Sequence, residues 1–158
     1  MSISLFLEVE AGADLGVVLH ALDSIQAEYS DGTDGLRGYL PASNTGFGFG
    51  IVDPPEAVVA EGIEASWQVG LLGSFHFRAC GFESAWEEIC HFIKRYAAAC
   101  GFRFVLSFQF ESVYAARLGK DLVFPGQLPR NAAQRAGRSL SDPISLPVAI
   151  YLMDRKPS

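Results

Sequence analysis

The most regular stretch of this sequence is Phe102-Arg-Phe-Val-Leu-Ser-Phe-Gln-Phe-Glu111. Large apolar side chains occupy every second position from Phe102 to Phe110, and mostly polar residues fill the places between them. Only a β-strand turns a period of two into one apolar and one polar face. Burying one large apolar side chain is worth roughly 1.5–3 kcal/mol, so five on one face would anchor a core. We therefore predict a central core strand here, facing Trp86 and Ile93 of a preceding helix.

The rest of the chain alternates between strand and helix patterns. Apolar residues at spacings of three and four predict helices over residues 15–29 and 82–100. Alternation predicts strands over residues 2–10, 46–51 and 64–79, a strand pair over residues 113–124 and a last strand over residues 148–153. Residues 30–44, with two Asp-Gly pairs, are predicted to form a long loop, residues 56–61 a single helical turn, and residues 125–147 a linker-like segment.

The order of these elements predicts an α+β fold. Over residues 3–111 they follow β-α-β-β-α-β, which is the ferredoxin-like pattern of one antiparallel sheet with two helices on one face, and extra C-terminal strands would widen that sheet. The 158 residues are enough for a single domain with a full core. We expect the other sheet face to be flat and nearly uncharged, formed by Ser4, Phe6, Gly46, Gly48, Gly50, Ser66, Gln68, Ser74, His76, Ser107 and Gln109.

Composition limits the class of protein. Hydrophobic residues make up 49% of the chain and charged residues 19%, as in a globular protein. No apolar run approaches the roughly 20 residues that cross a bilayer. The first residues lack the basic and long apolar regions of a secretory signal. A cytoplasmic protein that does not enter the membrane is therefore expected.

Charge is distributed unevenly along the sequence. Residues 1–64 hold eleven acidic residues against Arg37 alone, a net charge of −10, whereas residues 117–158 carry a net charge of +4. An acidic front half argues against nucleic acid as a partner, because phosphates require Lys and Arg. Such an imbalance favours a basic protein partner.

Sequence motifs for catalysis or metal binding are missing. Cys80, Cys90 and Cys100 are spaced by ten residues and match no metal-ligand pattern, so we expect reduced, packed thiols. No nucleophile-elbow, zinc-protease or phosphate-loop motif occurs. We therefore predict no catalytic residue, no metal ligand and no cofactor. An enzyme that uses a cysteine with His76 or His91 remains a weaker alternative.

A family resemblance adds to this description. The run Phe104-Val-Leu-Ser-Phe-Gln-Phe-Glu-Ser-Val-Tyr-Ala-Ala-Arg117, together with the helix that begins at residue 82, resembles immunity proteins of bacterial polymorphic-toxin and contact-dependent growth inhibition systems. The resemblance implies a small cytosolic protein that blocks a toxin domain by binding it, and it carries over no site residue. The acidic front half fits independently, because a nuclease toxin must be basic enough to hold nucleic acid.

We predict a recognition surface for a basic partner formed by Asp31, Asp34, Tyr39, Asp53, Glu56, Glu61 and Glu64. The carboxylates would speed association and Tyr39 would act as an apolar anchor. Two alternatives stay open. In the first, the acidic residues serve only solubility. In the second, the flat Ser/Gly/Gln face binds a small molecule in a regulatory ferredoxin-like domain. The sequence indicates no oligomeric state.

Overall fold

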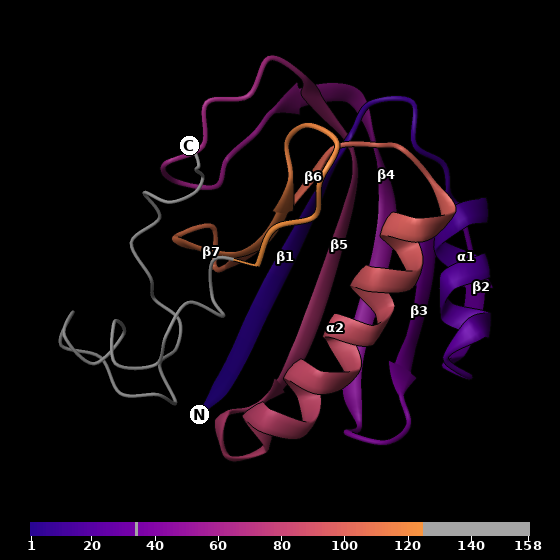
Figure 1. Cartoon of the computed structure of the whole chain (residues 1–158). Helices are drawn as coiled ribbons and strands as arrows, with labels where there is room; N and C mark the ends of the chain where they lie inside the picture. The colour runs from indigo at the N-terminus through magenta and orange to yellow at the C-terminus, as the bar shows by residue number, and fades with distance from the viewer. Residues whose placement is uncertain (34, 125–158) are drawn as a thin grey trace, which may run out of the picture.

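The computed structural model describes residues 1–33 and 35–124. They form a seven-stranded antiparallel sheet with the strand order β2-β3-β4-β5-β1-β6-β7, and two helices that pack together against it (Figure 1). The strands are β1 (Ser2–Glu10), β2 (Glu28–Gly32), β3 (Gly35–Leu40), β4 (Thr45–Ala57), β5 (Gln68–Arg78), β6 (Phe104–Phe108) and β7 (Ser112–Arg117). The helices are α1 (Leu15–Ser24) and α2 (Phe82–Ala99), the latter preceded by a short 3-10 turn at Ala79–Gly81.

The main core lies between the helices and one face of the sheet. In β1, alternate residues are fully buried there, because the strand sits between β5 and β6. An aromatic cluster occupies the middle: the ring centroids of Phe49, Phe75 and Phe92 lie 5.5–5.7 Å apart. A Cβ at Gly73 would overlap the Phe49 ring, so glycine in β5 makes room for it. One antiparallel sheet with two helices packed against it confirms the predicted α+β architecture. Neither helix in the described residues is long and apolar enough to cross a bilayer.

The phenylalanine-rich stretch forms β6, but only part of it follows the predicted pattern. Phe104 and Leu106 are fully buried, and the Phe104 ring packs 5.9 Å from that of Tyr96. The prediction of a single apolar face is wrong at Phe110. Gln109 and Phe110 have φ angles of 49° and 65°, which end the strand and turn the Phe110 ring to the other face. β6 is also not central, since only β7 lies beyond it.

The predicted long loop over residues 30–44 is wrong. Helix α1 ends at Ser24 instead of continuing to residue 29, and β2 and β3 then form an antiparallel hairpin. A Cβ at Gly38 would overlap the carbonyl oxygen of Glu28, so this glycine permits close strand approach. Extra strands therefore lie at both edges of the sheet, not only at its C-terminal edge.

Further along the chain, the helical turn predicted at residues 56–61 is also wrong, because β4 continues to Ala57. Of the strand pair predicted at residues 113–124, the first strand forms as β7. In place of the second strand there is a single β-bridge between Ala116 and Val123. The linker-like segment 125–147 and the strand at 148–153 lie outside the described residues.

Strand β5 changes face along its length. Its register with β1 slips between the pairs Val9–Leu71 and Glu10–Val69. Strict alternation over the predicted strand 64–79 would place Trp67 and Val69 on one face with Phe75, and this prediction is wrong. Both pack on the opposite face, in a second cluster of buried residues with Ala60, Val105, Val113 and Ala116.

The C-terminal end of α2 is held by a buried cation. The Arg117 guanidinium donates hydrogen bonds to the carbonyl oxygens of Ala97, Cys100, at 2.6 Å, and Phe102, at 3.4 Å. A positive charge at the C-terminal, negative end of the helix dipole stabilises the helix, by about 0.3–2 kcal/mol. Arg117 thereby ties α2 to β7.

We predict that Gly70→Ala weakens the fold by disturbing the register slip. A Cβ at Gly70 would lie 2.6 Å from the Cα of Ala11. We expect a loss of roughly 1–3 kcal/mol in the free energy of unfolding, as for other overpacked sites, measured by urea titration. Gly101→Ala is the control, because nothing lies within 4 Å of its Cβ position. Equal stabilities for the two variants would contradict the proposed role of Gly70.

Candidate functional site

The predicted recognition residues lie on three parts of the molecule. Asp31 is exposed on β2 and Tyr39 on β3, while Asp34 lies outside the described residues. Asp53 and Glu56 are exposed on the outer part of β4. Glu61 and Glu64 belong to residues 58–67, which we call the cover segment.

The first part is the edge ribbon, defined as β2 and β3. All five residues of β2 are exposed. The Tyr39 hydroxyl donates to the Glu28 carboxylate at 2.9 Å, and the Tyr29 hydroxyl donates to Asp23 at 2.7 Å. These hydrogen bonds to carboxylates raise the pKa of both tyrosines. The rings are 41% and 37% exposed, so each is held in place while open to a partner.

Sequence reasoning missed half of this ribbon. Glu28 and Tyr29 were assigned to the end of a helix, whereas they begin β2. Glu28 lies directly opposite Tyr39 in the hairpin, which explains their hydrogen bond. The β-branched and aromatic signal of a strand is weak here, since β2 reads Glu-Tyr-Ser-Asp-Gly. The two Asp-Gly pairs were the only hint of a hairpin.

The second part is the outer end of β4. Pairing between β4 and β5 is interrupted between Ile51 and Glu56, so the residues between them leave the regular ladder. Asp53 and Glu56 lie at the same end of the sheet as the turn of the β2–β3 hairpin, because a Cβ at Gly35 would meet the carbonyl oxygen of Phe49. Tyr39 lies toward the opposite end, about 13 Å along β3 from that turn.

The third part, the cover segment, is held over the sheet by a buried carboxylate. Glu8 is 1% exposed and accepts hydrogen bonds from the backbone amides of Val59, at 2.6 Å, and Ala60, at 3.0 Å. The Glu61 amide donates to the carbonyl oxygen of Phe110 at 2.7 Å. Glu61 therefore lies over β1 and β6, about 19 Å of strand spacing from β2. The predicted residues do not form one compact patch.

The sheet face opposite the helices is only partly flat. The Phe110 ring stacks on Phe6 with centroids 4.4 Å apart, and the cover segment lies over the neighbouring strands. Toward β3 and β4 the face stays open, with the partly exposed glycines of β4 beside Arg37 and Tyr39. It therefore carries charges that the prediction of a nearly uncharged face does not include, among them Arg37, predicted in a loop, and Glu28, predicted in a helix.

A serine and a histidine meet on this open face. Ser4 Oγ lies 2.8 Å from His76 Nδ1, and the Phe6 ring packs edge-on against the imidazole. His76 is exposed, as predicted for the polar side of its strand. Within residues 1–33 and 35–124 no carboxylate is hydrogen-bonded to this histidine, so the third member of a catalytic triad is not found there.

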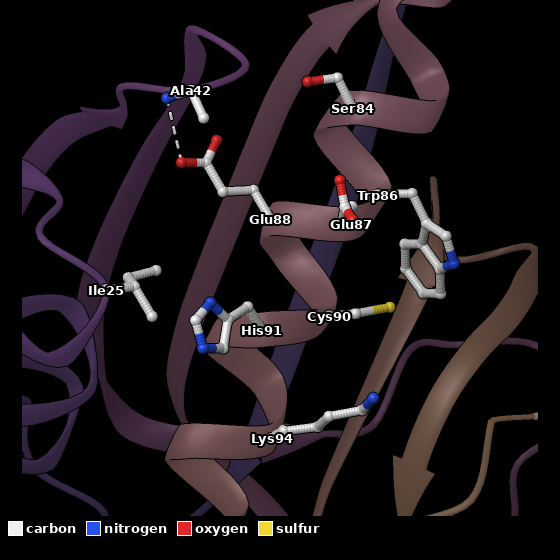
Figure 2. Close-up of a pocket in the computed structure, with 9 residues that line it drawn as sticks. All are labelled: Ile25, Ala42, Ser84, Trp86, Glu87, Glu88, Cys90, His91 and Lys94. Carbon is white, nitrogen blue, oxygen red and sulfur yellow. Dashed lines mark hydrogen bonds between the residues drawn. The ribbon is translucent and has the colours of Figure 1, made fainter.

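A shallow groove of about 590 Å³ runs along the outer surface of α2 (Figure 2). The Glu88 carboxylate at its side accepts hydrogen bonds from the amides of Ala42, at 3.1 Å, and Ser43, at 2.9 Å, and so holds the turn between β3 and β4. His91 is exposed and lies 3.5 Å from the Arg95 Nε that donates to it. Two of the polar side chains that line the groove, Glu88 and His91, thus already have structural partners.

The three cysteines lie in different surroundings. Cys80 is exposed, Cys90 is buried and Cys100 donates its thiol proton to the Tyr96 carbonyl at 3.5 Å; all three are free thiols. Burial raises the pKa of the Cys90 thiol to about 12, so it is protonated at neutral pH. In the part of the chain that the structure describes, no group of three or more His, Cys, Asp or Glu side chains is placed to hold a metal ion.

Comparison with known proteins gives no relative. No protein-family model, no curated protein and no solved structure matches this chain.

We predict that the thiols differ sharply in reactivity. In the native protein Cys80 should react first with a thiol-specific reagent, and Cys90 should react most slowly because its thiol is buried and protonated. Denaturation without reductant should release three thiols. Rapid labelling of Cys90 in the native protein, located by peptide mapping, would contradict this prediction. It would favour the alternative of an enzyme that uses a cysteine.

We predict that Glu8 and Glu10 affect stability with opposite pH dependence. Burial raises the pKa of the Glu8 carboxyl above its ordinary value of 4.5, although the amides of Val59 and Ala60 oppose this. Protonation therefore favours the folded chain: the Glu8 contribution is complete below pH 4.5 and is lost as the pH rises through the raised folded-state pKa. Hydrogen bonds from Arg103 lower the pKa of Glu10, whose contribution is present above pH 4.5 and is lost as the pH falls through its folded-state pKa.

Urea titrations of Glu8→Gln and Glu10→Gln across this pH range test the prediction. The stability of the natural chain relative to Glu8→Gln should fall as the pH rises from 4.5 toward neutrality. Relative to Glu10→Gln it should stay level over that window and fall only below pH 4.5. A pH-independent difference for Glu8→Gln would mean that its carboxyl group is not desolvated.

Proposed function

We propose that this chain is a cytosolic binding protein that neutralises a basic toxin domain by direct contact, in the manner of an immunity protein. The observation that carries the proposal is the edge ribbon. Its outer strand is entirely exposed and carries the carboxylates of Glu28 and Asp31, against the single basic residue Arg37 in β3. Two tyrosine rings are fixed there by hydrogen bonds to carboxylates. Such a surface combines charge for association with aromatic anchors for retention.

The chemistry of the expected partner supports the same reading. A domain that cleaves nucleic acid needs Lys and Arg to hold phosphates. Asp31, Asp53 and Glu56 are exposed toward one end of the sheet, where a basic surface would meet them. Tyrosine loses little conformational entropy on binding, and less still when its hydroxyl is already bonded. Tyr39 is therefore proposed as an anchor and the carboxylates as the steering charge.

We also propose a ferredoxin-like core for the domain. The strands β4, β5, β1 and β6 are consecutive neighbours in the antiparallel sheet, and α1 and α2 follow β1 and β5 in the chain. On this proposal the edge ribbon is an insertion between α1 and β4, and β7 is a C-terminal addition. The inserted ribbon is thus available for recognition without altering the core.

A second candidate is a small-molecule-binding, regulatory domain that uses the open sheet face. It is favoured by the partly exposed glycines Gly46 and Gly48, which leave the backbone of β4 accessible between Tyr39 and His76. A planar ligand could lie on such a surface. Substitution of His76 would affect this activity and would leave toxin neutralisation unchanged, which separates the two functions.

We predict that reversing three acids, Asp31→Lys, Asp53→Lys and Glu56→Lys, slows association with the partner. The test partner is the C-terminal domain of the protein encoded immediately upstream. Association should slow at least tenfold in low salt and become less salt-dependent, while the melting temperature changes little because all three side chains are exposed. Tyr39→Ala should instead speed dissociation. Stopped-flow binding and toxin-rescue growth assays give the readouts.

The matched control reverses Glu87, Glu111 and Asp121 to Lys. These side chains are also exposed, so the net charge changes equally at other places on the surface. This control should retain most of the association rate. If the first triple variant bound as fast as the natural chain in low salt, the acidic surface would not be the recognition surface.

A further inference from the structure

The strand β2 is an open edge of the sheet. It pairs with β3 on one side, and in the described part of the chain its backbone bonds to no other strand or loop. The opposite edge differs, because Ala116 of β7 exchanges two backbone hydrogen bonds with Val123, at 2.9 and 2.8 Å. Within residues 1–33 and 35–124 the chain therefore fills part of its own β7 edge but leaves the outer backbone groups of β2 without a partner.

Negative charge lies on both faces of this edge. Glu28 is opposite Tyr39, which places it on the open face, whereas Asp31 is opposite the buried Leu36 and so lies on the helix side. Asp23, hydrogen-bonded to Tyr29, adds a second carboxylate on the helix side. A strand laid against β2 would alternate its side chains between a face that carries Glu28 and a face that carries Asp31 and Asp23.

We propose that an extended, basic segment of the partner protein pairs with β2 as an additional strand. The inference rests on the proposed function and adds its binding mode. Main-chain hydrogen bonds to β2 supply the attachment, while Lys or Arg residues of the segment face Glu28 on one side and Asp31 with Asp23 on the other. Tyr39, one strand further in, offers its exposed ring to an Arg side chain on the open face.

A second copy of this chain does not fit the same edge. Pairing β2 with β2 would set Glu28 and Asp31 of one copy beside the carboxylates of the other, and like charges on adjacent strands repel. Acidic side chains on an exposed edge are a common protection against self-association. They oppose an acidic strand and admit a basic one.

The test uses the full chain labelled with ¹⁵N and a capped peptide that alternates Arg-Arg with Val-Val, so that Arg lies on both faces of the added strand. The control peptide keeps the same charge and has Pro in place of its central Val, which prevents strand pairing. The alternating peptide should slow hydrogen exchange of alternate amides within residues 28–32 at least tenfold and bind at least tenfold more tightly than the proline peptide. Glu28→Lys with Asp31→Lys should weaken it at least tenfold; Glu87→Lys with Glu111→Lys should not.

Three results would overturn the inference: equal binding of the two peptides, unchanged exchange in β2, or slow exchange there in the free monomer, which would mean that another segment of the chain already covers the edge. A dimer with protected β2 amides, seen by sedimentation without peptide, would identify a second copy as the occupant.

The upstream toxin domain separates the two proposals. If it binds and leaves β2 exchange unchanged, only the binding mode fails; if it does not bind while the peptide pairs with β2, only the proposed function fails.

Discussion

The register slip between β1 and β5 is the constraint on which the rest of the molecule depends. At Gly70 the backbone of Ala11 approaches so closely that no side chain fits, and the Ala11 amide donates to the Gln68 carbonyl at 2.7 Å. On one side of this point β5 contributes Leu71 and Phe75 to the helix-side core. On the other side it turns Val69 to the opposite face. Two cores thus share one strand.

The second core explains why the cover segment lies where it does. Trp67 and Val69 need apolar neighbours on the face without helices, and Ala60 of the cover segment supplies one. Glu8 accepts two backbone amides of this segment, and that of the buried Ala60 would otherwise lack a partner. A buried carboxylate is costly, and here two amide hydrogen bonds offset part of that cost.

Much of the core could be predicted because unbroken elements keep their period. Phe104 and Leu106 face inward by strand parity, and Ile89, Ile93 and Tyr96 of the apolar stripe of α2 are buried as expected. The errors fall where the chain breaks its period. Phe110 changes face through two consecutive residues with positive φ, and Trp67 through the slip at Gly70. Neither event has a periodic signal, because each depends on backbone contacts made by distant strands.

The candidate site was predictable in composition but not in arrangement. The acidic front half is evident from the sequence, and the exposure of Asp31, Asp53 and Glu56 follows from their charge. The hydrogen bond between Tyr39 and Glu28 is not evident from the sequence, because it requires the pairing of β2 with β3. The glycines of these two strands weaken the strand pattern that would predict this pairing. Geometry across strands is information that a linear pattern does not contain.

The uneven thickness of the molecule has a consequence for its local stability. Around β1 and β6 the sheet is covered on both faces, by the helices and by the second core, so opening there must break contacts on two sides. The edge ribbon is covered on one face at most, and its outermost strand, β2, is exposed on both faces. Sub-global unfolding should therefore begin at β2 and β3 and leave the rest of the sheet intact. A strand pair that can detach and reform independently can adjust its twist to another protein while the remainder stays rigid.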